Sequence, residues 1–188
     1  FIKADYTGVM PVVAKTQTVL LEDLYRSFLT AFGLVAVVMM FALRSVRAGL
    51  LAMLPNIFPT LLIFGLLGWL EIPIDIGSVM SASIALGVAV DDTLHFLTTF
   101  QRSLASGASR RQAVRESYRH CGRAMWQSSL ICGAGMAVFA LSDFVPTARF
   151  AWMMVALFAA AIVGDLMLLP ALLLGPFGKL WETCESRD

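Results

Sequence analysis

Two adjacent carboxyl side chains, Asp91 and Asp92, interrupt a long apolar stretch of the sequence. On a helix, His95 would lie one turn from Asp91 and three residues from Asp92, so its imidazole could approach either carboxyl. An acidic residue at the centre of a membrane-spanning helix costs about +2.5 to +3.5 kcal/mol on insertion scales. Two neighbouring acids cost more than packing alone justifies, and such residues are typical of polar paths and proton relays.

Several interpretations of these polar residues stay open at this point. The alternative for the pair is a static polar contact between helices. The spacing of His95 suits a proton relay and equally a histidine that Asp91 merely orients. Asp165, in the last apolar stretch, could face the same polar track or form one hydrogen bond to a neighbouring helix. Because neighbouring carboxyls titrate as a coupled unit, Asp91 and Asp92 are not assigned separate roles.

The composition indicates which solvent surrounds these residues. Hydrophobic residues make up 59% of the 188 residues and charged residues 14%, whereas soluble domains carry about 25% charged residues. So few charges cannot cover a globular surface, and we expect the lipid bilayer as the main partner and no nucleic acid. The three cysteines, Cys121, Cys132 and Cys184, show no metal-ligand spacing. No metal and no cofactor is therefore predicted.

Five apolar stretches are long enough to cross a bilayer, which needs about 20 mostly apolar residues. They run over residues 27–43, 49–70, 76–100, 124–141 and 150–174. We therefore predict an all-α fold, a polytopic membrane helix bundle of five transmembrane helices within a transmembrane domain of residues 24–178. Residues 1–23 are predicted to lead into the membrane, and residues 179–188 to form a tail.

The longest connection between the predicted spans, residues 101–123, is strongly basic. It carries Arg102, Arg110, Arg111, Arg115, Arg119 and Arg123. Its apolar and small residues recur at a spacing of three to four, which predicts an amphipathic helix on the membrane surface. A solvated basic connector without special function is the alternative.

The positions of the basic residues predict an orientation, because such residues concentrate in cytoplasmic loops. One side would hold Arg44, Arg47, the six arginines of the connector, Lys179 and Arg187; the other would hold Lys3, Lys15, Arg26 and Arg149. The first side is thus expected to be cytoplasmic, with the C-terminus there and the N-terminal end outside. An odd number of spans entering from outside, together with a first residue other than Met, suggests a piece of a longer protein.

Small residues indicate where helices can approach one another closely. Ser83 and Gly87 precede Asp91 at intervals of one helical turn, and Ser129 and Gly133 fit the small-xxx-small pattern. These four residues are therefore predicted helix-packing positions, and the carboxyls near them are expected to face protein and trapped water. Asn56 is interpreted as an ordinary interhelix hydrogen-bonding residue.

At this point the sequence resembles a known family. The segment from Leu86 to Asp92, followed by Thr93 and His95, is similar to the fourth-helix signature of resistance–nodulation–division (RND) exporters, especially the hydrophobe/amphiphile and MMPL-like branch. Further segments that resemble the family are Leu54-Pro55-Asn56-x-x-Pro59, Ile72-Pro73-Ile74-Asp75 and Leu169-Pro170-Ala171-Leu172. The resemblance covers residues 22–179, and the helix with the acid pair is its most specific part.

The resemblance implies a secondary active transporter of the bacterial inner membrane, not an enzyme, built from two six-helix halves with periplasmic insertions. The five spans would be helices two to six of one half, with the C-terminal half favoured, and residues 1–23 would end the periplasmic porter region. Asp91 and Asp92 would carry protons. The implied partners are the other half, the porter domains and a hydrophobic or lipid substrate, while self-association is left open.

Two other functions remain as alternatives. Sterol-sensing domains share the five-helix arrangement, so a lipid-binding membrane module without proton flux is the main competitor. An intramembrane aspartyl protease is a third class, because Gly164-Asp165 and Pro170-Ala171-Leu172 echo its motifs. However, Ile162 stands where that signature has glycine, and both elements lie on one predicted helix, whereas a catalytic dyad needs acids from two helices.

Overall fold

The computed structural model describes residues 9–175, which form helices and short connections with no strand among them. In chain order the elements are α1 (Val9–Ala42), α2 (Val46–Trp69), α3 (Ile76–Ala105), α4 (Arg110–Ser117), the π-helical turn η1 (Tyr118–Gly122), α5 (Arg123–Phe139), α6 (Val145–Val163), the π-helical turn η2 (Gly164–Leu168) and α7 (Leu169–Leu174). The all-α prediction is confirmed for this part of the chain. Several predicted features lie outside the described residues: the tail, the start of the lead-in, Lys3, Lys179, Cys184 and Arg187.

Four helical segments are long and apolar enough to cross a membrane: Lys15–Ala42, Val46–Trp69, Ile76–Ala105 and Val145–Leu174. They correspond to four of the five predicted spans. The fifth prediction, residues 124–141, falls on α5, whose 17 residues are not among them. The count of five spans therefore stays a prediction.

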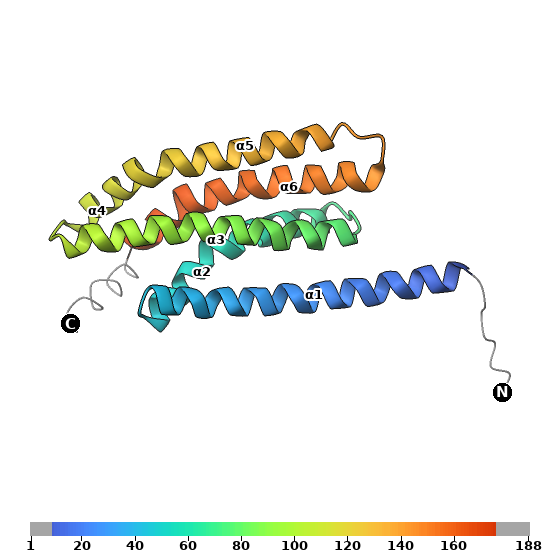
Figure 1. Cartoon of the computed structure of the whole chain (residues 1–188), viewed down its shortest axis with the longest axis horizontal. Coiled ribbons are helices and arrows are strands. Elements are labelled where there is room, and N and C mark those ends of the chain that lie inside the picture. Colours follow the sequence, from blue (N-terminus) through green and yellow to red (C-terminus); the bar gives the residue numbers. More distant parts are fainter. Residues whose placement is uncertain (1–8, 176–188) are drawn as a thin grey trace.

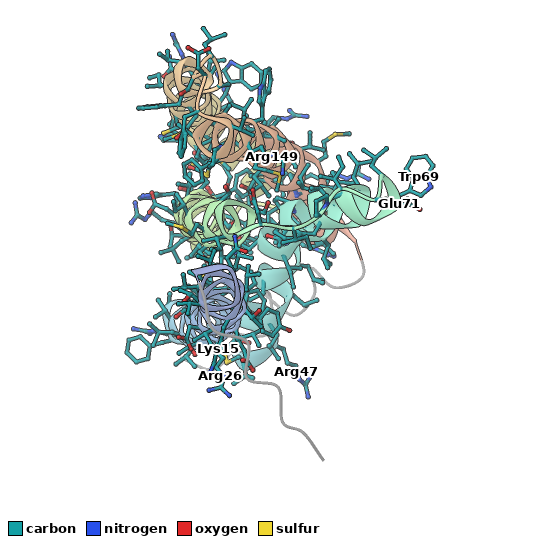
Figure 2. All side chains as sticks on the ribbon, turned by 90° about the vertical axis from the view of Figure 1, so that its right-hand side faces the viewer. Lys15, Arg26, Arg47, Trp69, Glu71 and Arg149 are labelled. Carbon is teal, nitrogen blue, oxygen red and sulfur yellow. The ribbon has the colours of Figure 1, made fainter. Side chains whose placement is uncertain are left out.

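The helices run antiparallel to one another in sequence order, with α3 near the middle of the bundle (Figure 1). α3 packs against α1, α2, α4 and α6, and α5 packs against α6 on the side away from α1. The α1–α2 loop and the connector after α3 lie at one end of the bundle, and the α2–α3 and α5–α6 loops lie at the other. Figure 2 looks at this second end, where Arg149 of α6 and Glu71 after α2 are found.

Two side-chain caps fix the loops that start the central helices. Ser45 accepts a hydrogen bond from the Ala48 backbone N–H at 3.3 Å and so caps α2. Asp75 accepts hydrogen bonds from the backbone N–H and the hydroxyl of Ser78, at 2.8 and 2.7 Å, and so caps α3. Asp and Ser are favoured at this position because their oxygens satisfy helix N–H groups that lack an intrahelical partner. These caps explain why both helices begin where they do.

Two segments differ in extent from the sequence prediction. α1 begins at Val9 and runs without a break through the described part of the predicted lead-in; Pro11 stands in its first turn, where proline is tolerated. The basic connector is not one helix: α3 continues to Ala105, Gly107 turns the chain at a φ of +86°, and α4 with η1 then leads into α5. Part of the apolar face of α4, Ala113 and Val114, is buried in the core cluster of the bundle. A membrane-surface position for this segment stays a prediction.

Many large apolar side chains on the outside of the bundle have no protein neighbour to cover them. Phe41 of α1 is 87% exposed, and Trp69 at the end of α2 is 82% exposed. Further exposed apolar residues are Leu34, Val37, Leu61, Leu66, Ile131, Val138, Trp152 and Met167. Such a surface is unfavourable in water but normal for helices whose solvent is lipid or another helical domain.

The close approach of α1 and α2 depends on one glycine. Gly49 is buried, and a Cβ at this position would lie 2.6 Å from the Met40 Cα of α1. Because the obstructing atoms include backbone, the two helices cannot accommodate a larger residue without moving apart. Gly65 lies on the same helix with no atom within 4 Å of its Cβ position.

We expect Gly49→Ala to destabilise the purified protein by about 1–3 kcal/mol, the usual range for overpacking. Gly65→Ala is the matched control, and it should be neutral or slightly stabilising because alanine favours helix over glycine by about 0.5–1 kcal/mol. Thermal unfolding in detergent, followed by circular dichroism, measures both. Equal unfolding temperatures for the two variants would contradict this account of the α1–α2 contact.

Candidate functional site

A buried chain of polar side chains joins three helical elements at the centre of the bundle. The Thr93 hydroxyl of α3 lies 2.8 Å from the Asn56 Oδ1 of α2 and 2.8 Å from the Asp165 Oδ1 of η2. All three residues are at most 1% exposed. Buried polar groups are nearly always hydrogen-bonded, because leaving them without a partner is costly. These two contacts therefore fix the relative positions of α2, α3 and η2.

The Asn56 amide is held in one orientation by α2 itself. Its Nδ2 donates to the Ala52 carbonyl at 3.1 Å, so its Oδ1 faces Thr93. A flipped amide would place two oxygen acceptors against each other at the Ala52 carbonyl. Asn56 thus presents an acceptor, and only an acceptor, to the Thr93 hydroxyl.

Two prolines and one glycine bring α2 and the end of α6 together. Pro59 has no N–H, so it cannot form the usual helical hydrogen bond to the Pro55 carbonyl. Gly164 packs against that carbonyl: a Cβ on Gly164 would lie 3.1 Å from the Pro55 oxygen and 3.2 Å from the Phe58 ring. The absence of a side chain at Gly164 thus allows the approach that places Asp165 beside Thr93.

Asp165 lies in the π-helical turn η2, between α6 and α7. A π turn contains an extra residue relative to an α-helix and changes the direction of the side chains around it. Such turns are rare and are found frequently at functional sites. Asp165 therefore lies in a π-helical backbone conformation that is rare overall and frequent at functional positions.

Asp91 and His95 lie on a different face of α3. Their side chains are 72% and 70% exposed, and the His95 Nε2 lies 3.6 Å from the Asp91 Oδ1. The predicted one-turn proximity of this pair is thus present. Both side chains are exposed within residues 9–175, and the expectation that both carboxyls of the acid pair face protein stays a prediction for Asp91.

Asp92 lies between these two regions. Its side chain is half-buried; the charges of Asp91 and His95 act on it, and its own charge acts on Asp165. The four residues predicted as a proton relay are therefore arranged from an exposed stripe, Asp91 and His95, through Asp92 to the buried Asp165. Carboxyl and imidazole groups are the side chains that exchange protons most readily near neutral pH.

The predicted helix-packing residues have different surroundings. Ser129 is buried, and Ser83 is half-buried with its hydroxyl donating to the Val79 carbonyl at 3.3 Å. The Cβ positions of Gly87 and Gly133 have no atom within 4 Å in the described part of the chain. Gly87 continues the exposed stripe of Asp91 and His95. The role of these four residues in packing stays a prediction.

Two residues of the buried chain were not predicted as functional. In the sequence Thr93 stands out only as part of a motif, and Asn56 only as an ordinary interhelix hydrogen-bonding residue. The available signal was weak, because single hydroxyl and amide residues are common in membrane helices. In the described part of the chain, no group of three or more His, Cys, Asp or Glu residues is arranged to hold a metal ion.

Comparison with known proteins gives two findings. The model of the MMPL family matches residues 2–185. The chain is also similar to the trehalose monomycolate exporter MmpL3 of Mycolicibacterium smegmatis, with 30% identity over 178 residues. That alignment covers 90% of this chain but 17% of the exporter, so the chain spans a small part of the length of this relative.

The geometry at Gly164 leads to a further prediction. Gly164→Ala should push η2 away from Pro55 and Phe58, and so lengthen the contact between Asp165 and Thr93. A shift of a few tenths of an ångström would relieve these contacts, so we expect Gly164→Ala to be less stable than its control by about 1 kcal/mol, the low end of the range for overpacking. Gly135→Ala, whose Cβ has no atom within 4 Å, is the control. Chemical unfolding in detergent checks the difference, and equal stability of the two variants would show that η2 does not need the glycine.

Proposed function

The chain belongs to the MMPL family, and from this premise we propose that it is the membrane half of a proton-driven RND-type exporter. Its cargo would be a lipid or another hydrophobic or amphiphilic compound. The mycobacterial relative is named for the export of trehalose monomycolate, and only the broad class of cargo is carried over from it. The whole transport activity belongs to a protein much longer than this chain.

The arrangement of acids on α3 carries this proposal. Asp91 and Asp92 stand midway along α3, far from both ends of a span that is long enough to cross the bilayer. Acids at that depth are costly, and they mark polar paths by default. We assign proton transfer to the pair as a unit, with His95 and Asp165 as relay groups on its exposed and buried sides.

The exposed stripe of α3 supports the proposal that another domain of the exporter packs against this chain. Asp91 and His95 are charged or polar side chains on a face that no described element covers, which would be unfavourable against lipid. The other half of the exporter would cover it and exclude lipid from the acids. The porter domains would then couple proton movement to cargo movement.

We further propose that α5 crosses the membrane as the fifth span. It runs alongside α6 and joins the two ends of the bundle (Figure 1). α5 has seventeen residues, the lower end of the range of about 17–25 residues that a membrane-spanning helix needs. At 1.5 Å per residue it extends about 26 Å, which is close to the hydrocarbon thickness of about 30 Å.

With five spans, the loops of the bundle fall on alternate sides. The arginine-rich segment 101–123 and the α1–α2 loop share one end, which we propose to be cytoplasmic. The N-terminal end would then be periplasmic and the C-terminus cytoplasmic, in a bacterial inner membrane. On this view residues 1–23 lead in from the porter region, residues 24–178 form the transmembrane domain, and residues 179–188 form the tail.

One observation favours the alternative function, a lipid-binding module without proton flux. A mainly apolar cavity of about 560 Å³ lies between α2, α3 and α6 at the end of the bundle shown in Figure 2. Its lining includes Leu67, Trp152 and Met153, with Arg149 and Asp75 as charged groups. Such a cavity could hold part of a lipid, but it does not explain acids midway along α3.

Proton-driven export by the full-length protein in proteoliposomes tests the proposal. We expect Asp91→Asn and Asp92→Asn each to reduce export driven by a pH gradient to the level of protein-free vesicles, because an amide cannot carry the proton. Asp143→Asn is the matched control, since Asp143 is exposed in the α5–α6 loop. It should export normally.

Two outcomes would decide between the functions. If both acid variants export as well as Asp143→Asn does, the acid pair is structural and proton-driven export is wrong. If export fails in the acid variants while a lipid still binds with unchanged affinity, the two functions are separable and the exporter assignment stands.

The fifth span has its own test. In a variant whose native cysteines are replaced, we expect Ser142→Cys and Arg115→Cys to react with a membrane-impermeant thiol reagent from opposite sides. Both positions are exposed, at the two ends of the η1–α5 segment. Labelling of both from the same side would mean that α5 does not cross the membrane.

A further inference from the structure

The Thr93 hydroxyl has two acceptors but one proton. Asn56 Oδ1 can only accept, because the amide is fixed by its donation to the Ala52 carbonyl. An ionised Asp165 can also only accept. If Asp165 is ionised, the single hydroxyl proton must serve one of two buried acceptors, and the other is left without it.

A proton on Asp165 removes this conflict. The Asp165 carboxyl then donates to the Thr93 oxygen, Thr93 donates to Asn56 Oδ1, and Asn56 Nδ2 donates to the Ala52 carbonyl. Each donor has one acceptor, and the bonds run in one direction from η2 to α2. Hydrogen bonds aligned in this way polarise and strengthen one another.

We propose that Asp165 is a proton-binding site and that Thr93 transmits its occupancy to α2 as a latch. With the proton bound, the chain Asp165–Thr93–Asn56 ties α2, α3 and η2 together. When the proton leaves to the Asp91–Asp92 pair, the Thr93 hydroxyl turns to the Asp165 carboxylate and Asn56 loses its donor. α2 is then released from α3. The latch rests on the proposed proton-driven function for its role in transport, but its proton binding is independent of it.

The charged groups around Asp165 suit a proton-bound carboxyl. α3 contributes Asp92, whose negative charge acts on Asp165. The charged side chains of α2, α5 and α6 are Arg47, Arg123 and Arg149, which are all exposed. Within residues 9–175 no ion pair joins any of them to Asp165. Among the described residues, the site therefore holds one acid near another and no counter-ion.

The backbone on both sides of the latch is able to respond. Pro55 and Pro59 each remove a helical hydrogen bond from α2 around Asn56, and proline is a common cause of helix bending. On the other side, Asp165 lies within the π turn η2. The side-chain bonds thus connect two places where the regular α-helical hydrogen bonding is interrupted.

The proton on Asp165 can be observed directly by infrared difference spectroscopy of the full-length protein. A protonated carboxyl gives a C=O band that shifts in D2O, and we expect one such band to disappear in Asp165→Asn. If a folded protein shows no band assignable to Asp165 at any pH down to the acid limit of folding, the proton-binding site does not exist.

The link to α2 is tested by hydrogen exchange of the α2 amides in the same protein, after correction for the intrinsic pH dependence of exchange. Thr93→Val removes the hydroxyl, and exchange around Asn56 should become roughly three- to tenfold faster, as expected from losing one hydrogen bond. Thr93→Ser keeps the hydroxyl and should restore protection. Ser81→Ala, which removes another buried hydroxyl of α3, is the control and should leave α2 unchanged.

The pH dependence separates a latch from a merely structural contact. Raising the pH should release α2 in the unmodified protein but not in Asp165→Asn, whose amide N–H₂ donates to Thr93 at every pH. Protection of α2 that does not change with pH in the unmodified protein would overturn the latch even if Asp91 and Asp92 prove essential for export. Conversely, pH-dependent release together with export that needs no proton gradient would uphold the latch and refute the proposed function.

Discussion

The hydrogen bonds of a single hydroxyl hold the centre of this bundle together. Thr93 reaches Asn56 on one side and Asp165 on the other, both at 2.8 Å and both out of reach of solvent. Inside a bilayer no water replaces a lost partner, so each of these groups depends on the others. Two features of the local sequence favour this contact. Gly164 lets η2 approach α2 closely, and Pro55 and Pro59 each remove one backbone hydrogen bond from α2 near Asn56.

α3 has two kinds of polar face, and they have different surroundings. The stripe of Gly87, Asp91 and His95 is exposed, whereas Thr93 is fully buried among α2 and η2. Asp92 lies between them and interacts electrostatically with residues on both sides. This division places a buried and an exposed polar face within a turn of the same helix.

The sequence predicts most of the helices, but it does not predict which residues of different helices form hydrogen bonds with one another. Long apolar stretches identified α1, α2, α3 and α6, because span length is a local property. The acids on α3 were predicted as a site because they are costly at that depth. Thr93 and its partners were not, since Asn56 lies 37 residues and Asp165 lies 72 residues away in the chain. No spacing rule connects residues on three separate helices. The start of α1 and the break of the connector at Gly107 are not predicted, because apolar length does not report where a polar helix continues.

The order of the helices along the chain bears on how the protein is made. α3 is the least hydrophobic of the four candidate spans, and it leaves the ribosome well before η2 does. During synthesis Thr93 can find Asn56 at once, since α2 precedes it, but Asp165 arrives only after α4, η1, α5 and α6 have been added. Until then α3 must be retained beside the insertion machinery or by its neighbours α1 and α2. The bundle is thus completed by its last apolar helix, and a nascent chain that stops before Asp165 would leave Thr93, on its least hydrophobic span, without one of its two partners.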